Sequence, residues 1–159
     1  MALQTVDARE AGGAGCFRTE PVPREKVPDM PKKSTPLRVL VVEDELLIRW
    51  SVVETLACAG HSVAQAPNGA AAIRALRSTP TPIDVVLLDY RLPDSNDLSL
   101  LTAIRRLSPE SSVVMMTAYG TPELTRRALD IGVHCVLNKP FDMQEMSAVV
   151  AAASTARSQ

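Results

Sequence analysis

The chain has 159 residues, of which 46% are hydrophobic and 3% aromatic, and its formal net charge is −1. This length suits one domain with an aliphatic core, and the nearly balanced charge provides no basic face, so we expect no direct binding of nucleic acid. No apolar run reaches the roughly 18 residues of a membrane-spanning helix, and three scattered cysteines without metal-ligand spacing favour a cytoplasmic protein with free thiols.

The first 36 residues differ from the rest of the chain. Five of the twelve prolines and a glycine-rich stretch at 12–15 fall in them, and no hydrophobic periodicity is sustained. This composition predicts a disordered or extended tail over 1–36. Met30 would also make an ordinary start of translation, which would leave only a short tail before the first strand.

From residue 37 onward, strand and helix patterns alternate five times. Four runs are continuously apolar, which is typical of strands buried on both faces of a parallel sheet. These runs span 37–42, 85–88, 113–116 and 134–137, and a further short strand is predicted at 61–66.

Helical patterns follow each predicted strand, at 46–59, after residue 68, near 98–107, at 122–131 and after residue 142. Capping residues mark their ends: Asn68, Thr121 and Asp142 at the starts, and Gly60 and Gly132 at the ends. Five such units with short loops predict an α/β fold, a doubly wound five-stranded parallel sheet between two helical layers, which is a flavodoxin-like three-layer sandwich. We place this domain at 37–153 and a C-terminal tail at 154–159.

Polar side chains follow four of the predicted strands at the point where each strand ends. They are Glu43, Asp44, Asp89, Thr117 and Lys139. The carboxyl ends of parallel strands meet at one edge of a sheet, so we expect these side chains to lie together. Three carboxylates this close would repel one another and raise each other's pKa without a cation. Because Mg²⁺ is held by carboxylates, water and phosphate oxygens, the sequence predicts a Mg²⁺-dependent site that accepts a phosphoryl group.

Asp89 is the expected nucleophile, since a carboxylate can attack phosphorus and form an aspartyl phosphate. Lys139 would supply a positive charge to one phosphoryl oxygen, and Thr117 a hydroxyl to another. Lys139 precedes Pro140 in a turn at a strand end, where a cis X–Pro bond is often found. Each of these residues alone also fits an ordinary surface position. The prediction therefore depends on all of them following strands at the same edge of the sheet.

These residues resemble the receiver domain of two-component response regulators. The similarity lies in four segments: VVEDE at 41–45, LLDYRLPDSND at 87–97, MMTAYG at 115–120 and LNKPF at 137–141. The similarity covers roughly residues 37–153. The sequences of these segments are most similar to those of receivers attached to sigma-54-dependent activators.

The resemblance implies a metal and phosphoryl site. Asp89 would be the phosphoacceptor, and a sensor histidine kinase or a histidine phosphotransfer protein would be the donor. Asp44 would bind Mg²⁺ directly, Glu43 would act mainly through water, and Arg91 would contribute its backbone carbonyl.

The resemblance also implies a switch rather than an enzyme, with only Mg²⁺-dependent self-phosphorylation and slow autodephosphorylation. Thr117 and Lys139 would move to the phosphoryl group. This rearrangement would change the surface of the fourth helix, fifth strand and fifth helix, where we expect a downstream protein of unknown identity or a second copy to bind.

Two positions depart from the family pattern. Val136 stands three residues before the lysine, where receivers usually have an aromatic residue, so the usual swing of a ring is not available for readout. Asp97 stands where the family has a glycine; it can cap the third helix, but a positive φ there would be strained.

Arg91 lies two residues past Asp89, and we hypothesise that its side chain affects water access to the acyl phosphate and hence the lifetime of the switch.

Four functions are compatible with these observations. The first is a stand-alone receiver, since only nine residues follow Val150. The second is the receiver fragment of a DNA-binding transcription regulator. The third is a Mg²⁺-dependent phosphohydrolase, which Arg91 disfavours because such enzymes have an acid–base aspartate two residues after the nucleophile. The fourth is a degenerate receiver that binds partners without phosphorylation, which Val136 keeps open.

Overall fold

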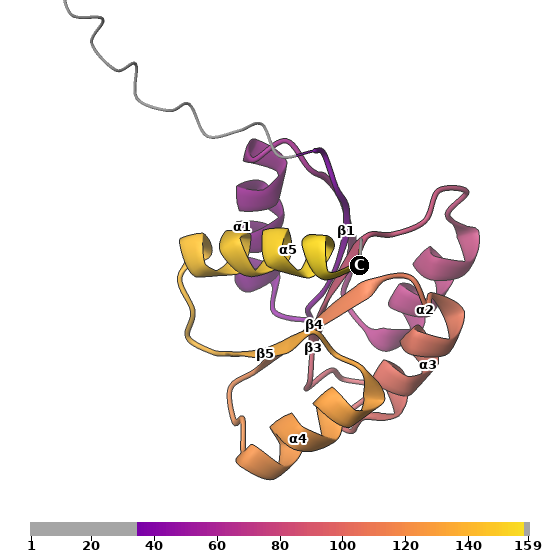
Figure 1. Cartoon of the computed structure of the whole chain (residues 1–159), viewed down its shortest axis with the longest axis vertical. Helices are drawn as coiled ribbons and strands as arrows, with labels where there is room; N and C mark the ends of the chain where they lie inside the picture. Colours follow the sequence, from indigo (N-terminus) through magenta and orange to yellow (C-terminus); the bar gives the residue numbers. More distant parts are fainter. Residues whose placement is uncertain (1–34, 158–159) are drawn as a thin grey trace, which may run out of the picture. The chain divides into compact units, whose positions relative to one another are not determined.

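The computed structural model describes residues 35–157, in which five strands alternate with five helices (Figure 1). The elements are β1 (Arg38–Val42), α1 (Leu46–Cys58), β2 (Ser62–Ala66), α2 (Gly69–Ser78), β3 (Val85–Asp89), α3 (Ser99–Leu107), β4 (Ser112–Thr117), α4 (Pro122–Ile131), β5 (Cys135–Asn138) and α5 (Met143–Arg157). None of the helices in this range is long and apolar enough to cross a bilayer. The predicted tail and the alternative start at Met30 lie outside the described residues, apart from the exposed residues 35 and 36.

The strands form one parallel sheet in the order β2-β1-β3-β4-β5, which confirms the predicted doubly wound α/β fold. The chain first adds β2 on one side of β1 and then crosses over to add β3 on the other side. The strand order therefore reverses between β1 and β3, the position at which open parallel sheets bind ligands. All residues of β3 are buried, as the apolar run 85–88 predicts for its first four residues.

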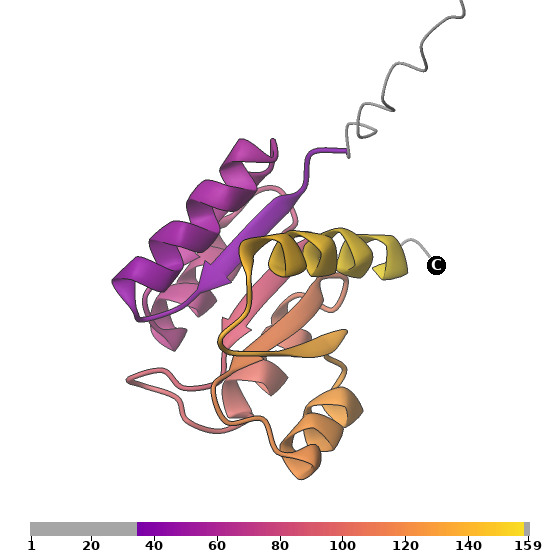
Figure 2. The same cartoon turned by 90° about the vertical axis from the view of Figure 1, so that its left-hand side faces the viewer.

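Helices cover both faces of the sheet (Figures 1 and 2). On one face, Val39 of β1 shares a core with Val52 of α1 and Val150 of α5. On the other face, Leu40 of β1 shares a core with Ile104 of α3, and α2 and α4 belong to the same cluster. Successive residues of a strand point to opposite faces, so each central strand contributes to both cores.

The helix starts follow the predicted capping residues. Asn68, Thr121 and Asp142 each accept, through a side-chain oxygen, the backbone N–H three residues later, at 2.8, 3.1 and 2.6 Å. Gly132 ends α4 with a φ of 114°, in the left-handed region that glycine adopts without strain. At its C-terminal end, α5 continues to Arg157, so residues 154–157, which we expected in a tail, are helical. Alanine is the strongest helix former, and the alanine-rich residues 151–156 extend the helix.

Candidate functional site

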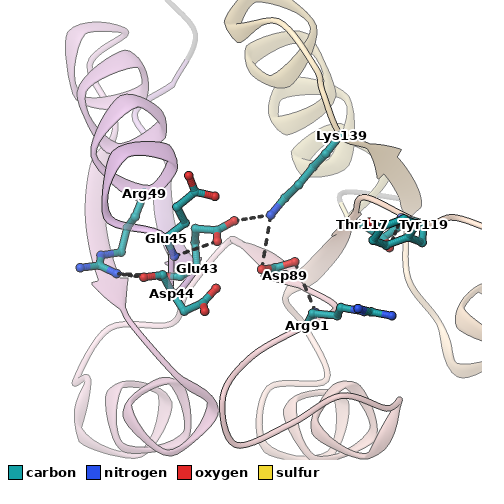
Figure 3. Close-up of polar contacts among 9 residues, drawn as sticks. All are labelled: Glu43, Asp44, Glu45, Arg49, Asp89, Arg91, Thr117, Tyr119 and Lys139. Atoms are coloured by element: carbon teal, nitrogen blue, oxygen red, sulfur yellow. Dashed lines mark hydrogen bonds and ion pairs between the residues drawn. The ribbon is translucent and has the colours of Figure 1, made fainter.

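The carboxyl ends of four strands bring the predicted polar residues together at one edge of the sheet (Figure 3). Glu43 and Asp44 directly follow β1, Asp89 and Thr117 are the last residues of β3 and β4, and Lys139 directly follows β5. Carboxylate oxygens of the three acidic residues lie within 4.8 Å of one another. This edge includes the reversal of strand order between β1 and β3.

Asp89 is a buried carboxylate in this group, with 6% of its surface exposed. Burial and the negative charge of Glu43 raise its pKa to about 6, against the opposing effects of Lys139 and of the Arg91 N–H, which donates to Asp89 Oδ1 at 3.4 Å. The carboxyl of Asp89 therefore titrates close to neutral pH, and its charge depends on the cations beside it.

Lys139 extends from the end of β5 to both buried carboxylates. Its Nζ lies 2.7 Å from Glu43 Oε2 and 3.3 Å from Asp89 Oδ2. Burial alone would lower the pKa of Lys139, but the hydrogen bond to Glu43 and the charge of Asp89 outweigh burial and raise this pKa, so the amine is a cation at neutral pH. The peptide bond between Lys139 and Pro140 is cis, as expected for this turn.

Glu43 and Asp44 are adjacent in the chain but differ in their surroundings. Glu43 is 1% exposed, and both of its carboxylate oxygens have protein partners: Oε1 accepts the Glu45 N–H at 3.1 Å, and Oε2 pairs with Lys139. Asp44 is exposed to solvent. Asp44 is therefore better placed than Glu43 to bind a cation directly.

Arg49 holds the loop that carries both acids, a contact that the sequence pattern did not indicate. From the first turn of α1, its Nη1 donates to the Glu43 carbonyl at 2.7 Å and approaches the Asp44 carbonyl at 3.4 Å, and its Nε donates to the Gln65 side chain at 3.1 Å. Since the main partners are backbone atoms, no pattern of residue types signals them. The available signal was a basic residue in the first turn of the helix that follows the acidic pair.

Thr117 is buried, and its hydroxyl bonds to the loop that follows it. Thr117 Oγ1 accepts the Tyr119 N–H at 3.2 Å, and the Thr117 carbonyl accepts the Lys139 N–H at 2.8 Å. The Arg91 guanidinium lies over the Tyr119 ring, 5.0 Å from its centroid, which is a cation–π contact. Thr117 and Tyr119 lie together on one side of Asp89 (Figure 3). The involvement of Tyr119 was not predicted.

The two departures from the expected pattern have ordinary local structure. Val136 is half-buried and packs against the core beneath α2, α3 and α4. Asp97 accepts the Ser99 N–H at 2.8 Å at the start of α3. Within residues 35–157 only glycines have a positive φ, so the strain considered for Asp97 does not arise.

Known proteins share this sequence and fold. The response regulator receiver domain family matches residues 39–151. The DNA-binding transcriptional regulator NtrC of Escherichia coli (strain K12) is 39% identical over 112 residues, which cover 70% of this chain and 24% of NtrC. The transcriptional regulatory protein PdtaR of Mycobacterium tuberculosis (strain CDC 1551 / Oshkosh) is 34% identical over 116 residues, which cover 71% of this chain and 54% of PdtaR. The chain thus spans about a quarter of the length of NtrC and about half that of PdtaR.

Solved structures support the same fold. A CheY-like response regulator receiver domain protein from Methanospirillum hungatei JF-1 has a TM-score of 0.72 at 22% identity, with 78% of this chain and 98% of that chain covered. NtrX from Brucella abortus has a TM-score of 0.70 at 29% identity, with 78% of this chain and 27% of that chain covered. These similarities agree with the fold assigned from the strand order.

Proposed function

The chain belongs to the receiver domain family of two-component response regulators, and we propose on this basis that Asp89 is its phosphoacceptor. A histidine kinase or a histidine phosphotransfer protein donates the phosphoryl group in the cytoplasm, and the phosphorylated chain binds another protein through the α4–β5–α5 face. The observation that carries this proposal is the position of Asp89. It is a buried carboxylate at the reversal of strand order, with its Oδ2 3.3 Å from Lys139 Nζ.

Each residue of the edge has a separate role in phosphoryl transfer. An oxygen of Asp89 forms a bond to phosphorus as the P–N bond of the donor phosphohistidine breaks, and the imidazole nitrogen keeps the bonding electron pair. Lys139, which lies 2.7 Å from Glu43, turns its ammonium to a phosphoryl oxygen and offsets the incoming charge. Thr117 rotates away from the Tyr119 N–H and donates its hydroxyl to a second phosphoryl oxygen.

Mg²⁺ fits the set of oxygen donors at this edge. Three carboxylates lie within 4.8 Å of one another. Among the described residues, Lys139 pairs with Glu43 and Asp89, and no ion pair forms at Asp44, which leaves excess negative charge. Asp44, Asp89 and the backbone carbonyl of Arg91 would hold the ion, and Glu43 would act through water. When bound, Mg²⁺ neutralises the carboxylates and the phosphoryl oxygens.

The site works as a switch and not as an enzyme with turnover. Arg91 occupies the position two residues after Asp89 where aspartyl-phosphate hydrolases have an acid–base aspartate. Without that group no side chain at this position can activate water, so the chain catalyses only its own phosphorylation from small donors and a slow loss of the phosphoryl group.

A second candidate is the receiver portion of a transcription regulator. The observation that favours it is that the 112 matched residues amount to 24% of NtrC, a protein named for DNA binding. In that case phosphorylation of Asp89 controls a DNA-binding domain of the same polypeptide. An immunoblot of source cells distinguishes the two candidates. Only the second gives a band whose apparent mass exceeds that of a 159-residue polypeptide.

Intact mass spectrometry after incubation with acetyl phosphate and Mg²⁺ tests the main proposal. We expect the wild type to gain one phosphoryl group and Asp89→Asn to gain none. Asp130→Asn, which changes an exposed aspartate on α4, should behave like the wild type. Equal labelling of Asp89→Asn would refute the assignment. A wild type that accepts nothing from acetyl phosphate or from a phosphorylated histidine phosphotransfer protein would favour a degenerate receiver.

A further inference from the structure

Tyr119 is an aromatic residue with 70% of its surface exposed that is joined to the site at two points. The usual route of readout is closed to this chain, because Val136 has no ring that could move between solvent and core. We propose that Tyr119 transmits the phosphorylation state of Asp89 to the surface in place of that missing aromatic. The inference rests on the proposed phosphorylation of Asp89.

The first connection is the hydrogen bond that the Tyr119 N–H donates to Thr117 Oγ1 at 3.2 Å. Thr117 is 2% exposed and ends a strand paired on both sides, so its hydroxyl moves by rotation of χ1 between staggered positions. Rotation toward a phosphoryl group on Asp89 removes the acceptor from the Tyr119 N–H. Because the residue is exposed, the N–H then bonds to water, and the loop at Tyr119 is no longer held to β4.

The second connection is the side chain of Arg91. Its guanidinium lies 5.0 Å from the centroid of the Tyr119 ring, while its backbone N–H donates to Asp89 Oδ1 at 3.4 Å. A phosphoryl group adds roughly 1.5 to 2 negative charges beside this N–H. A guanidinium binds phosphate oxygens by charge-assisted hydrogen bonds, which are stronger than an exposed cation–π contact. In the unphosphorylated structure the Arg91 side chain extends away from Asp89, on the side of Tyr119 (Figure 3). Phosphorylation therefore draws the guanidinium toward Asp89 and away from the ring.

Tyr119 has space into which it can move. It lies between β4 and α4, beside a recess of about 360 Å³. Besides Tyr119 and Arg91, the recess is lined by Tyr90, Thr121, Glu123, Leu124 and Arg127. A ring released from the guanidinium turns into this recess and packs against the first turn of α4. The surface at the start of α4 therefore differs between the two states, which is the change that a partner can recognise.

Fluorine NMR of protein labelled with 3-fluorotyrosine tests the inference, because the sequence contains only Tyr90 and Tyr119. Tyr90→Phe assigns the two signals. We expect acetyl phosphate with Mg²⁺ to displace the Tyr119 signal, with the phosphoryl group verified by intact mass in the same sample. In phosphorylated Thr117→Ala the displacement of the Tyr119 signal should fall below half of its wild-type value. The displacement of the Tyr90 signal should persist, because Tyr90 directly follows Asp89. Arg91→Ala should reduce the Tyr119 displacement in the same way.

Matched variants separate this mechanism from a general disturbance. Thr117→Ser keeps the hydroxyl and should keep the Tyr119 displacement, as should Thr125→Ala on α4. A Tyr119 signal that stays in place in phosphorylated protein, or that moves equally in Thr117→Ala, overturns the inference and leaves phosphorylation standing. A wild type that gains no phosphoryl group removes the proposed function and this inference with it. If Thr117→Ala is not phosphorylated or does not fold, an undiminished displacement in Arg91→Ala overturns the inference.

Discussion

At Asp89, burial and the nearby charge of Glu43 favour the protonated carboxyl and raise its pKa to about 6. An unfolded aspartate titrates near about 3.9, so the folded chain holds an extra proton between these values. The contribution of this group to stability is therefore complete below the unfolded pKa and is lost as the pH rises through about 6. We predict that Asp89→Asn raises the free energy of unfolding by on the order of 1 kcal/mol at pH 7.5 in metal-free buffer, and much less at pH 4.

Urea unfolding at the two pH values measures this difference. Asp130→Asn serves as the control and should show no such dependence on pH. Mg²⁺ should reduce the advantage of Asp89→Asn, because the cation stabilises the carboxylate of the wild type. An Asp89→Asn variant that is no more stable than the wild type at pH 7.5 would show that burial does not penalise this charge.

The proposed Mg²⁺ site should depend on Arg49, which holds the backbone of the acidic loop. Its guanidinium donates to the carbonyl of Glu43 at 2.7 Å and lies 3.4 Å from that of Asp44, so its loss frees the loop without removing a metal ligand. We predict that Arg49→Ala weakens Mg²⁺ binding about tenfold, as is common for residues that orient ligands. Isothermal titration calorimetry measures this effect. Gln65→Ala, which removes only the contact to Nε, should have a smaller effect, and wild-type affinity in Arg49→Ala would exclude the positioning role.

The charged residues of the site could be predicted because each follows a strand whose apolar run ends there. The end of an apolar run indicates the positions of Asp89 and Glu43, and the parallel sheet brings these two residues together. Arg49 and Tyr119 could not be predicted. Arg49 contacts backbone carbonyls, and Tyr119 donates a backbone N–H and contacts a guanidinium, so both depend on loop conformations that residue types do not specify.

Among the secondary-structure elements, the strands and the starts of the helices were predictable, but the end of α5 was not. Residues 151–156 are small and carry no periodicity that distinguishes a docked helix from a tail. Docking depends on tertiary contacts: Ser112 Oγ donates to the Ala153 carbonyl at 2.7 Å, and Ala153 is buried in the core beneath α1 and α5. Such contacts between distant segments become visible only in the folded chain.

The start of α2 is held by a side chain from another loop. Asp94, which lies between β3 and α3, accepts the N–H groups of Gly69 at 2.8 Å and Ala70 at 2.9 Å. The bond from Gly69, followed by that from Ala70, lowers the pKa of Asp94. Its contribution to stability is therefore present above the unfolded pKa of about 3.9 and is lost as the pH falls through the lower folded value.

We predict that Asp94→Ala lowers the free energy of unfolding by about 1 kcal/mol at pH 7, as the loss of a helix cap usually does. Amide hydrogen exchange should become faster in the first turn of α2, at Gly69 and Ala70. Asp97→Ala is the matched control, because it removes a similar bond to Ser99 in α3 and should leave exchange in α2 unchanged. Equal acceleration in α2 for both variants would attribute the effect to the loop as a whole.

Across the whole molecule, the two edges of the sheet differ in how they are held. The candidate site lies at the carboxyl edge, on the ends of β3 and β4 and on the loops after β1 and β5. At the amino edge, Asp84 joins three elements: it accepts the Arg38 N–H of β1 at 2.8 Å, directly precedes β3, and pairs with Arg157 at the end of α5. These contacts tie β1, β3 and α5 together at the edge opposite the site.

The ion pair and hydrogen bond of Asp84 should stabilise the fold without affecting the site. Burial alone would raise the pKa of Asp84, but the Arg38 N–H and the Arg157 guanidinium outweigh burial and lower this pKa. Its contribution is present above the unfolded pKa of about 3.9 and is lost as the pH falls through the lower folded value. We predict that Asp84→Ala lowers the free energy of unfolding by about 1 to 2 kcal/mol at pH 7, measured by urea unfolding, and by much less at pH 2.5.

Arg157→Ala should lower the free energy of unfolding by only part of this amount, because the backbone bond remains and the ion pair is partly exposed. Both variants should still accept a phosphoryl group on Asp89, whereas a loss of phosphorylation in folded Asp84→Ala would show that the two edges are coupled.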